Sequence, residues 1–225
     1  MHIVILDRAA MGHDLNFDCL SAFGEVTSYD STCPDEASAR IAEAEVVVLN
    51  KVRLTEDILK AAPRLRLICV FATGYDNIDM MAAKKYGKAV CNVPAYSTES
   101  VVLFTVGTAL SLFAMLPAFS AYVRSGAYTE SGCPNCLSPV YREVAGKVWG
   151  IVGGGHIGTR VGEVAASLGA RVLVYQRHPH PKFPTVGLDT LCRESDILSV
   201  HCPLNGGTRG LIGRRELAVM KPGVV

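Results

Sequence analysis

The chain has 225 residues, of which 49% are hydrophobic, so it is long enough to bury the core of one large domain or of two ordinary ones. Acidic and basic residues nearly cancel to a formal charge of +1, which excludes the strongly basic surface of a protein that binds nucleic acid or anionic lipid. We therefore expect a small-molecule partner, with no nucleic acid and no membrane.

Residues 1–96 alternate short strand patterns with helical ones. Strands are predicted at residues 2–6, 25–29, 46–50, 67–71 and 89–93, and helices at residues 34–44 and 55–62. Unbroken apolar runs such as residues 67–71 are typical of strands covered on both faces by helices in a parallel sheet. This pattern predicts a doubly wound α/β domain over residues 1–96.

An apolar stretch at residues 101–119 is long enough to span a bilayer if every residue in it were apolar. Small, polar or proline residues interrupt it: Thr105, Gly107, Thr108, Ser111 and Pro117. Because it lies between two α/β patterns, we expect one long helix that is buried on most sides and opened by Ser97 or Thr98 as N-cap.

A loop rich in Gly, Ser, Pro and Cys is predicted over residues 126–139. Cys133 and Cys136 have the CxxC spacing of a redox or zinc site, but no second pair and no histidine cluster lies near them in the sequence. We expect a plain loop and no metal site. The eight cysteines follow no regular framework and the chain starts on a strand pattern instead of a signal peptide, so the expected location is cytoplasmic.

The alternation then restarts and predicts a second α/β domain over residues 97–225. Strands are expected at residues 147–153, 171–175 and 197–202, and helices at residues 156–168, 188–194 and 211–220. Val224 and Val225 look like the first residues of a further buried strand, so we expect this domain to be incomplete at its C-terminal end.

Residues 153–158 read Gly-Gly-Gly-His-Ile-Gly and satisfy GxGxxG between an apolar strand and an apolar-periodic helix. In such a turn Gly153 permits the tight bend, Gly155 lets a pyrophosphate approach the backbone, and Gly158 lets the helix pack closely on the strand. Because the motif lies directly between a predicted strand and a predicted helix, dinucleotide binding is the favoured interpretation. The alternative is a purely structural glycine turn.

About 20 residues further on, an Asp or Glu would hold the adenosine ribose hydroxyls of NAD. Here the residue is Gln176, followed by Arg177. A neutral amide does not repel a 2′-phosphate and a guanidinium can pair with it, so the sequence leans toward NADP over NAD. The alternative is that Gln176 bonds the ribose while Arg177 lies in solvent.

Four segments then carry a family resemblance. Residues 72–79 read ATGYDNID, residues 92–101 read NVPAYSTESV, the glycine turn follows, and residues 201–204 read HCPL with Thr208 close behind. In this order, across nearly the whole chain, they resemble the D-isomer-specific 2-hydroxyacid dehydrogenases, and most of all the hydroxypyruvate reductase or glycerate dehydrogenase branch. The resemblance implies a flavodoxin-like substrate domain and a Rossmann cofactor domain.

The resemblance also implies roles for single residues. Backbone N–H groups of Thr73, Gly74 and Tyr75 would bind the substrate carboxylate; the alternative is an ordinary loop with Asp79 capping the next helix. On the cofactor side, the resemblance implies contacts from His156 and Ile157 to the pyrophosphate, from Thr105 to the nicotinamide end, from His201 and Cys202 at a strand end, and from Pro203 and Thr208 to a ribose. His178 and His180 are expected to be solvated.

In this family a hydride passes between NAD(P)H and C2 of a small 2-oxo or 2-hydroxy acid, here expected to be hydroxypyruvate, glycerate or a glyoxylate-like acid. The Arg that polarises the carbonyl and the Glu-supported His that moves the proton are expected beyond residue 225, so no catalytic residue is assigned in this chain, which is expected to be inactive alone. A homodimer through the second domain is expected. The alternative is a short form that binds dinucleotide without catalysis.

Three residues depart from the family pattern. Leu103 and Phe104 stand where relatives often carry polar residues, and Tyr128 stands where close relatives often carry tryptophan. We expect the first two to reflect repacking of a buried helix; the alternative is a modified pocket or a shifted cofactor contact.

Overall fold

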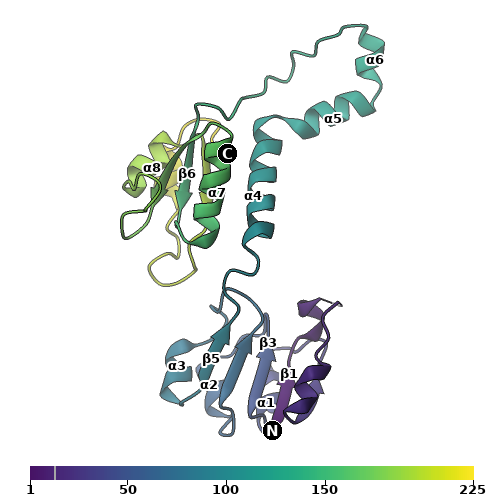
Figure 1. The fold of residues 1–225 in the computed structure, drawn as a ribbon, viewed down its shortest axis with the longest axis vertical. Coiled ribbons are helices and arrows are strands. Elements are labelled where there is room, and N and C mark those ends of the chain that lie inside the picture. Colours follow the sequence, from purple (N-terminus) through teal and green to yellow (C-terminus); the bar gives the residue numbers. More distant parts are fainter. Residues whose placement is uncertain (13) are drawn as a thin grey trace. The chain divides into compact units, whose positions relative to one another are not determined.

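The computed structural model describes residues 1–12 and 14–225, which divide into two compact units, Met1–Tyr96 and Ser97–Val225 (Figure 1). Both units are α/β, as the sequence predicts. No single helix among the described residues is long and apolar enough to cross a bilayer; one pair of helices, α4 (Thr98–Phe113) and α5 (Leu116–Arg124), meets the length and composition criteria jointly but is bent by 65°.

Unit 1 contains a five-stranded sheet of order β2-β1-β3-β4-β5 in which every pairing is parallel. The strands are β1 (His2–Ile5), β2 (Glu25–Ser28), β3 (Val46–Leu49), β4 (Leu67–Val70) and β5 (Ala89–Asn92). The connecting helices are η1 (Arg8–Met11), η2 (Asp18–Ala22), α1 (Ala37–Ile41), α2 (Glu56–Lys60) and α3 (Met80–Lys85). All five predicted strands are confirmed.

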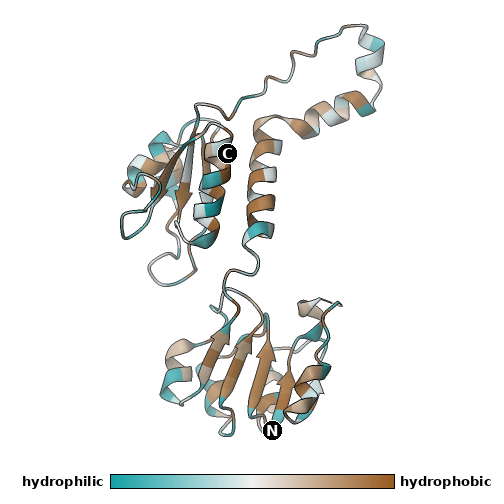
Figure 2. Ribbon diagram, viewed as in Figure 1, coloured by the Kyte–Doolittle hydropathy of each residue, from teal (hydrophilic) through white to brown (hydrophobic). Residues whose placement is uncertain are grey.

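Alternate side chains of these strands enter two different cores, because successive residues of a strand point to opposite faces of the sheet. Val4, Val47 and Ile68 lie in the larger core, which α1, α2 and α3 complete. Ile3, Ile5 and Val48 lie in the smaller core with Met11 of η1. Figure 2 shows the central strands β3 and β4 as apolar along their length, which is the pattern of strands covered on both faces.

The apolar stretch at residues 101–119 forms two helices instead of one: α4 (Thr98–Phe113) and α5 (Leu116–Arg124). The chain turns at Met115, which has φ +56°, and Pro117 follows in the first turn of α5. Proline has no N–H to donate to the carbonyl four residues earlier, so Phe113 O is left for another donor. The amide of Arg142 takes it at 3.1 Å, which ties the later loop to the end of α4.

The expectation that this helix is buried on most sides is also wrong. Val102, Val106, Ala109 and Phe113 are buried in the core of unit 2, where α4 lies beside α7 (His156–Ser167) (Figure 1). On the other side, Leu103 is 70% and Phe104 75% exposed. Repacking of a buried helix therefore does not explain these two residues, since nothing in the described chain covers them.

Unit 2 has a three-stranded parallel sheet of order β7-β6-β8, formed by β6 (Val148–Val152), β7 (Arg171–Tyr175) and β8 (Ile197–Val200). Its further helices are α6 (Ala127–Ser131), α7 (His156–Ser167), α8 (Leu188–Glu194) and α9 (Arg214–Val219). Gly169, with φ +83°, follows α7 as predicted. Val225 donates to Asp196 O and accepts from Leu198 N, so its backbone continues the sheet beside β8.

Candidate functional site

The turn between β6 and α7 is built from glycines that have different spatial requirements. Gly153 has φ +93°, and a Cβ there would lie 2.8 Å from Cys202 N, so only glycine fits. A Cβ on Gly158 would lie 2.0 Å from Gly153 O, whereas a Cβ on Gly155 would meet nothing within 4 Å. The turn is thus closed on the protein side and open at Gly155.

The open side faces the start of a long helix. α7 begins at His156, and its first main-chain hydrogen bond runs from Thr159 N to Gly155 O at 2.8 Å. The amides of residues 156–158 therefore precede the first bonded turn and are available to an external acceptor. With the positive end of the helix dipole, they form an arrangement suited to a phosphate group.

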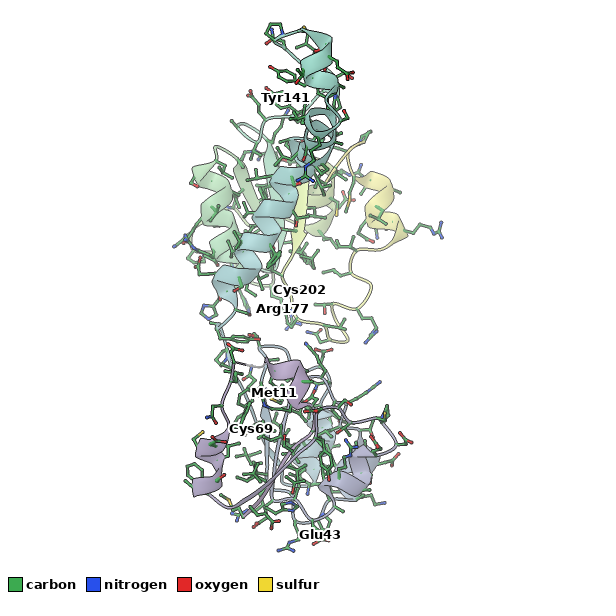
Figure 3. All side chains as sticks on the ribbon, turned by 90° about the vertical axis from the view of Figure 1, so that its right-hand side faces the viewer. Met11, Glu43, Cys69, Tyr141, Arg177 and Cys202 are labelled. Carbon is green, nitrogen blue, oxygen red and sulfur yellow. The ribbon has the colours of Figure 1, made fainter. Side chains whose placement is uncertain are left out.

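A cavity beside this turn collects most of the predicted cofactor-binding residues. It is lined by residues from the ends of β6, β7 and β8, among them Gly153, Gly155, Gln176, Arg177, His201, Cys202, Pro203 and Thr208. Figure 3 shows Arg177 and Cys202 together at the same end of unit 2. Parallel strands bring their carboxyl ends to one edge of a sheet, which is where open α/β sheets bind ligands.

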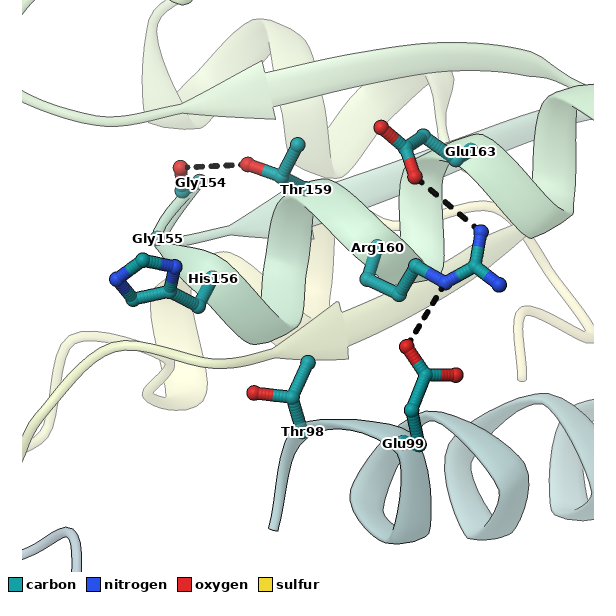
Figure 4. Close-up of a pocket in the computed structure, with 8 residues that line it drawn as sticks. All are labelled: Thr98, Glu99, Gly154, Gly155, His156, Thr159, Arg160 and Glu163. Carbon is teal, nitrogen blue, oxygen red and sulfur yellow. Dashed lines mark hydrogen bonds and ion pairs between the residues drawn. The ribbon is translucent and has the colours of Figure 1, made fainter. Parts of the chain in front are cut away.

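A second cavity lies on the α4 side of the turn (Figure 4). Thr98 and Glu99 of α4 line it with Gly154, Gly155, His156, Thr159, Arg160 and Glu163. Arg160 pairs with Glu99 at 3.0 Å and with Glu163 at 3.3 Å. Hydrogen bonds from Lys182 and from Arg160 hold the pKa of Glu163 below its usual value. The wall of this cavity is thus a chain of exposed ion pairs.

Three of the predicted cofactor-side residues line neither cavity. Thr105 is half-buried on α4, and Gly158 is buried beneath the turn. The side chain of Ile157 packs against the core of unit 2, so only its amide faces the turn.

Gln176 and Arg177 differ in how they are held. Gln176 Oε1 accepts from Gly154 N at 3.2 Å, and its Nε2 donates to His178 O at 2.8 Å. Within the described chain, Arg177 is exposed and makes no hydrogen bond or ion pair, and its Nη2 lies 3.7 Å from a Cβ built on Gly207. The neutral Gln176 side chain is thus hydrogen-bonded to the protein backbone, whereas the Arg177 guanidinium is unpaired in the described chain. The end of β7 therefore carries an exposed positive charge.

His201 lines the first cavity but its ring is mostly buried. Burial lowers the pKa of His201 below its usual value of 6.5, because the charged ring loses hydration. Its Nε2 is buried and finds no hydrogen-bond partner among the described residues. The charged form of the ring is therefore disfavoured near pH 7.

His180 is buried, and the expectation that it is solvated is wrong. Its side chain is 8% exposed and contacts Thr159 Oγ1 at 3.0 Å, while His178 is exposed as expected. Sequence reasoning missed His180, Thr159 and Gly154 as site residues, because a Pro-rich loop has no periodicity that marks a buried side chain. The available signal was the position of Gly154 inside the GxGxxG motif.

In unit 1, the 73–75 turn follows β4. Thr73 Oγ1 donates to Val93 O at 3.1 Å, and Asn92 Nδ2 donates to Thr73 O at 2.8 Å. The amides of Thr73, Gly74 and Tyr75 donate to no group in the described part of the chain. Asp79 also caps α3 by accepting from Ala82 N at 2.9 Å. The capping alternative and a carboxylate-binding turn are therefore compatible.

Cys133 and Cys136 lie in the loop after α6, where their thiols contact the carbonyls of Asn135 and Ser138. Among residues 1–12 and 14–225, no three His, Cys, Asp or Glu side chains gather in a way that could hold a metal ion.

Comparison with known proteins identifies similar chains. The D-isomer specific 2-hydroxyacid dehydrogenase catalytic domain matches residues 3–154, and the NAD binding domain of the same family matches residues 106–225. A hydroxypyruvate reductase from Blautia hydrogenotrophica is 34% identical over 100% of this chain and 73% of its own length. A glycerate dehydrogenase from Methylorubrum extorquens is 34% identical over 97% of this chain and 69% of its own length. The crystal structure of an Aquifex aeolicus D-lactate dehydrogenase, complexed with NAD and lactic acid, has a TM-score of 0.85 at 25% identity, over 98% of this chain and 66% of its own.

Proposed function

The chain belongs to the D-isomer specific 2-hydroxyacid dehydrogenases, a family of oxidoreductases, and on that basis we propose that its glycine turn binds NAD(P) and its 73–75 turn binds a small 2-oxo or 2-hydroxy acid. The observation that carries the proposal is the open space at Gly155, directly at the start of α7. When bound, the dinucleotide supplies or accepts the hydride exchanged with C2 of the acid.

The residues present fit a dinucleotide. A pyrophosphate needs a backbone that it can approach closely and amides that point toward it. Gly155 provides the approach, and residues 156–158 provide the amides. The adjoining cavity between Gln176, Arg177 and Thr208 is placed to receive the adenosine ribose.

Gly155→Ala tests this proposal. Because Gly155 has φ −72° and open space around it, the added methyl group should cost no more than the loss of glycine at the N-cap of α7, about 1 kcal/mol, and otherwise obstruct only the ligand. We expect at least about a tenfold loss of NADH and NADPH affinity by calorimetric titration, equal to about 1.4 kcal/mol. The matched control is Gly187→Ala, at the N-cap of α8, where φ is −67° and no atom lies within 4 Å. Equal nucleotide affinity in both variants would contradict the proposal.

For the acid substrate, we propose that the amides of Thr73, Gly74 and Tyr75 bind its carboxylate. The support is that these N–H groups donate to no described residue and follow a parallel strand at its carboxyl end. The relatives hydroxypyruvate reductase and glycerate dehydrogenase point to a hydroxypyruvate-like or glycerate-like acid. In an active form of the protein, Gly74→Ala should raise KM for hydroxypyruvate and leave the affinity for NADH unchanged; an equal loss of both would contradict this assignment.

For the cofactor, we propose a preference for NADP over NAD. Gln176 adds no negative charge at the end of β7, and the unpaired Arg177 guanidinium can bind a 2′-phosphate bidentately. Arg177→Ala should weaken NADPH binding about tenfold or more and leave NADH binding nearly unchanged, since a hydrogen-bonded charge pair contributes about 1.5–3 kcal/mol. A similar loss for both nucleotides would refute the preference.

For the assembly, we propose a homodimer in which a second copy covers the exposed face of α4, and a cytoplasmic location that suits eight free cysteines. The face is formed by Leu103, Phe104, Gly107, Thr108, Ser111 and Leu112, and exposed apolar surface of this kind commonly marks an interface. Phe104→Glu should shift the mass measured by light scattering to that of a monomer. Met81→Glu, at a residue 79% exposed in unit 1, is the control that should not. A monomeric wild type would reject the dimer.

A further inference from the structure

Gly154, the central glycine of the turn, has both main-chain polar groups bound by side chains. Its amide donates to Gln176 Oε1 at 3.2 Å, and its carbonyl accepts from Thr159 Oγ1 at 3.0 Å. The same hydroxyl contacts His180 Nε2 at 3.0 Å. A Cβ on Gly154 would lie 2.5 Å from Gln176 Oε1 and 2.6 Å from His180 Cδ2, so the segment after β7 leaves no space for a side chain there.

The hydrogen bonds determine where the His180 proton resides. Nδ1 accepts from the amides of Lys182 and Phe183, both at 3.1 Å, so it carries no hydrogen. In the neutral ring Nε2 then carries it. Thr159 has a single hydroxyl hydrogen and donates it to Gly154 O, so the hydroxyl oxygen must accept from Nε2. Both arguments give one directed chain, from His180 through Thr159 to Gly154.

The imidazole is held rigidly at the start of this chain. His180 is 8% exposed and stacks on Phe183, with ring centroids 5.2 Å apart and an interplanar angle of 18°. Phe183 in turn packs on α7, because a Cβ on Gly162 would lie 2.6 Å from its ring. His180 N donates to Thr185 Oγ1 at 2.8 Å. The 180–185 loop is therefore anchored to the helix that starts at the glycine turn.

We propose that His180, acting through Thr159, is a positioning residue that fixes the phosphate-binding turn and the segment carrying Arg177 in one geometry. It thereby sets both the affinity for the dinucleotide and the discrimination between NADP and NAD. The inference rests on the proposed nucleotide site. Neither side chain needs to touch the cofactor, because preorganising the turn removes an ordering cost from binding.

The test compares NADPH and NADH affinities of the 225-residue chain by calorimetric titration. Thr159→Val keeps the shape of the side chain and removes the hydroxyl, and should weaken both nucleotides about three- to tenfold, the range of one hydrogen bond. Thr159→Ser should restore the affinity. His180→Asn keeps an acceptor for the two loop amides but removes the donor to Thr159, and should lower the NADPH to NADH affinity ratio.

The two substitutions break the same chain, so His180→Asn should cost little more once Thr159 is valine. The control pair is His2 and Thr27, which belong to unit 1 and make the same contact, Nε2 to Oγ1 at 3.0 Å. Thr27→Val should leave both affinities unchanged.

The possible failures are distinguishable. A wild type that binds neither nucleotide would reject the proposed function. In a second outcome, the wild type binds while Thr159→Val and His180→Asn change neither the nucleotide affinities nor the NADPH to NADH ratio. That result, or fully additive effects of the two substitutions on affinity, would reject the positioning role alone. If thermal melting shows His180→Asn to be unfolded, the comparison of Thr159→Val with Thr159→Ser decides the question.

Discussion

The indole Nε1 of Trp149 donates a hydrogen bond to Ser199 Oγ at 3.0 Å, across the β6–β8 pair. Trp149 is fully buried, so its indole N–H has little access to water that could replace this acceptor. Ser199→Ala should therefore lower the free energy of unfolding by about 1–3 kcal/mol, the cost of a buried unsatisfied donor. Urea denaturation measures it. Ser167→Ala, at an exposed hydroxyl, should change stability by at most about 0.5 kcal/mol, and equal losses would contradict the argument.

Gly158→Ala should be more damaging than Gly162→Ala, although both lie on α7. At residue 158 the new methyl group would lie 2.0 Å from the backbone oxygen of Gly153, which cannot move without opening the turn. At residue 162 it would meet the Phe183 ring, a side chain that can be displaced at a lower cost than main-chain atoms. We expect a loss of about 3 kcal/mol or more for the first and about 1–2 kcal/mol for the second, measured by urea denaturation. The reverse order would show that the turn is not rigid.

The lowered pKa of His201 makes stability depend on pH in a defined direction. The unfolded chain takes up a proton as pH falls through 6.5, whereas the folded chain accepts it only at lower pH. The folded state is therefore disfavoured as pH falls below 6.5, by at most about 1.4 kcal/mol per pH unit, and this residue contributes no pH dependence well above 6.5. His201→Asn should flatten the profile of melting temperature below pH 6.5, and parallel profiles for the variant and the wild type would contradict the assignment.

Asp7 holds the loop after β3 through three backbone amides. Its carboxylate is 5% exposed and accepts from Asn50 N at 2.8 Å, Lys51 N at 2.5 Å and Val52 N at 3.2 Å. Asp7→Asn presents an NH₂ group to part of this set and should lower stability by about 1.5–3 kcal/mol. The control is Asp189→Asn, in an exposed ion pair with Arg193, which should cost at most about 1 kcal/mol. Chemical denaturation distinguishes them.

The parts of the fold that local chemistry determines are predictable from the sequence. Residues 171–175 and 188–194 form a strand and a helix with the expected bounds, and Gly153 has the left-handed backbone that the tight bend requires. The apolar pattern and the glycine spacing are local properties of the sequence. At these three positions each is compatible with one type of local structure.

Features that depend on distant partners were not predictable in the same way. The prediction of one long helix overlooked the break that Pro117 favours, and the turn also involves the Arg142 amide, 29 positions after Phe113, which binds the released carbonyl. The burial of His180 likewise depends on Thr159 and on Phe183, whose ring stacks on it, and no sequence period connects the three. The composition of the loop predicts a solvated His180, whereas its contact with Thr159, distant in the sequence, accompanies its burial.

The double attachment of Gly154 has a consequence for redesigning coenzyme choice. Gln176 bridges Gly154 N and His178 O, so replacing it with the acid typical of NAD sites changes the support of the bend as well as the charge near the ribose. Aspartate is one methylene shorter and has no donor for His178 O. Residues 176–183 therefore act as one structural unit. Conversion to another coenzyme calls for replacing this whole segment together with Thr159.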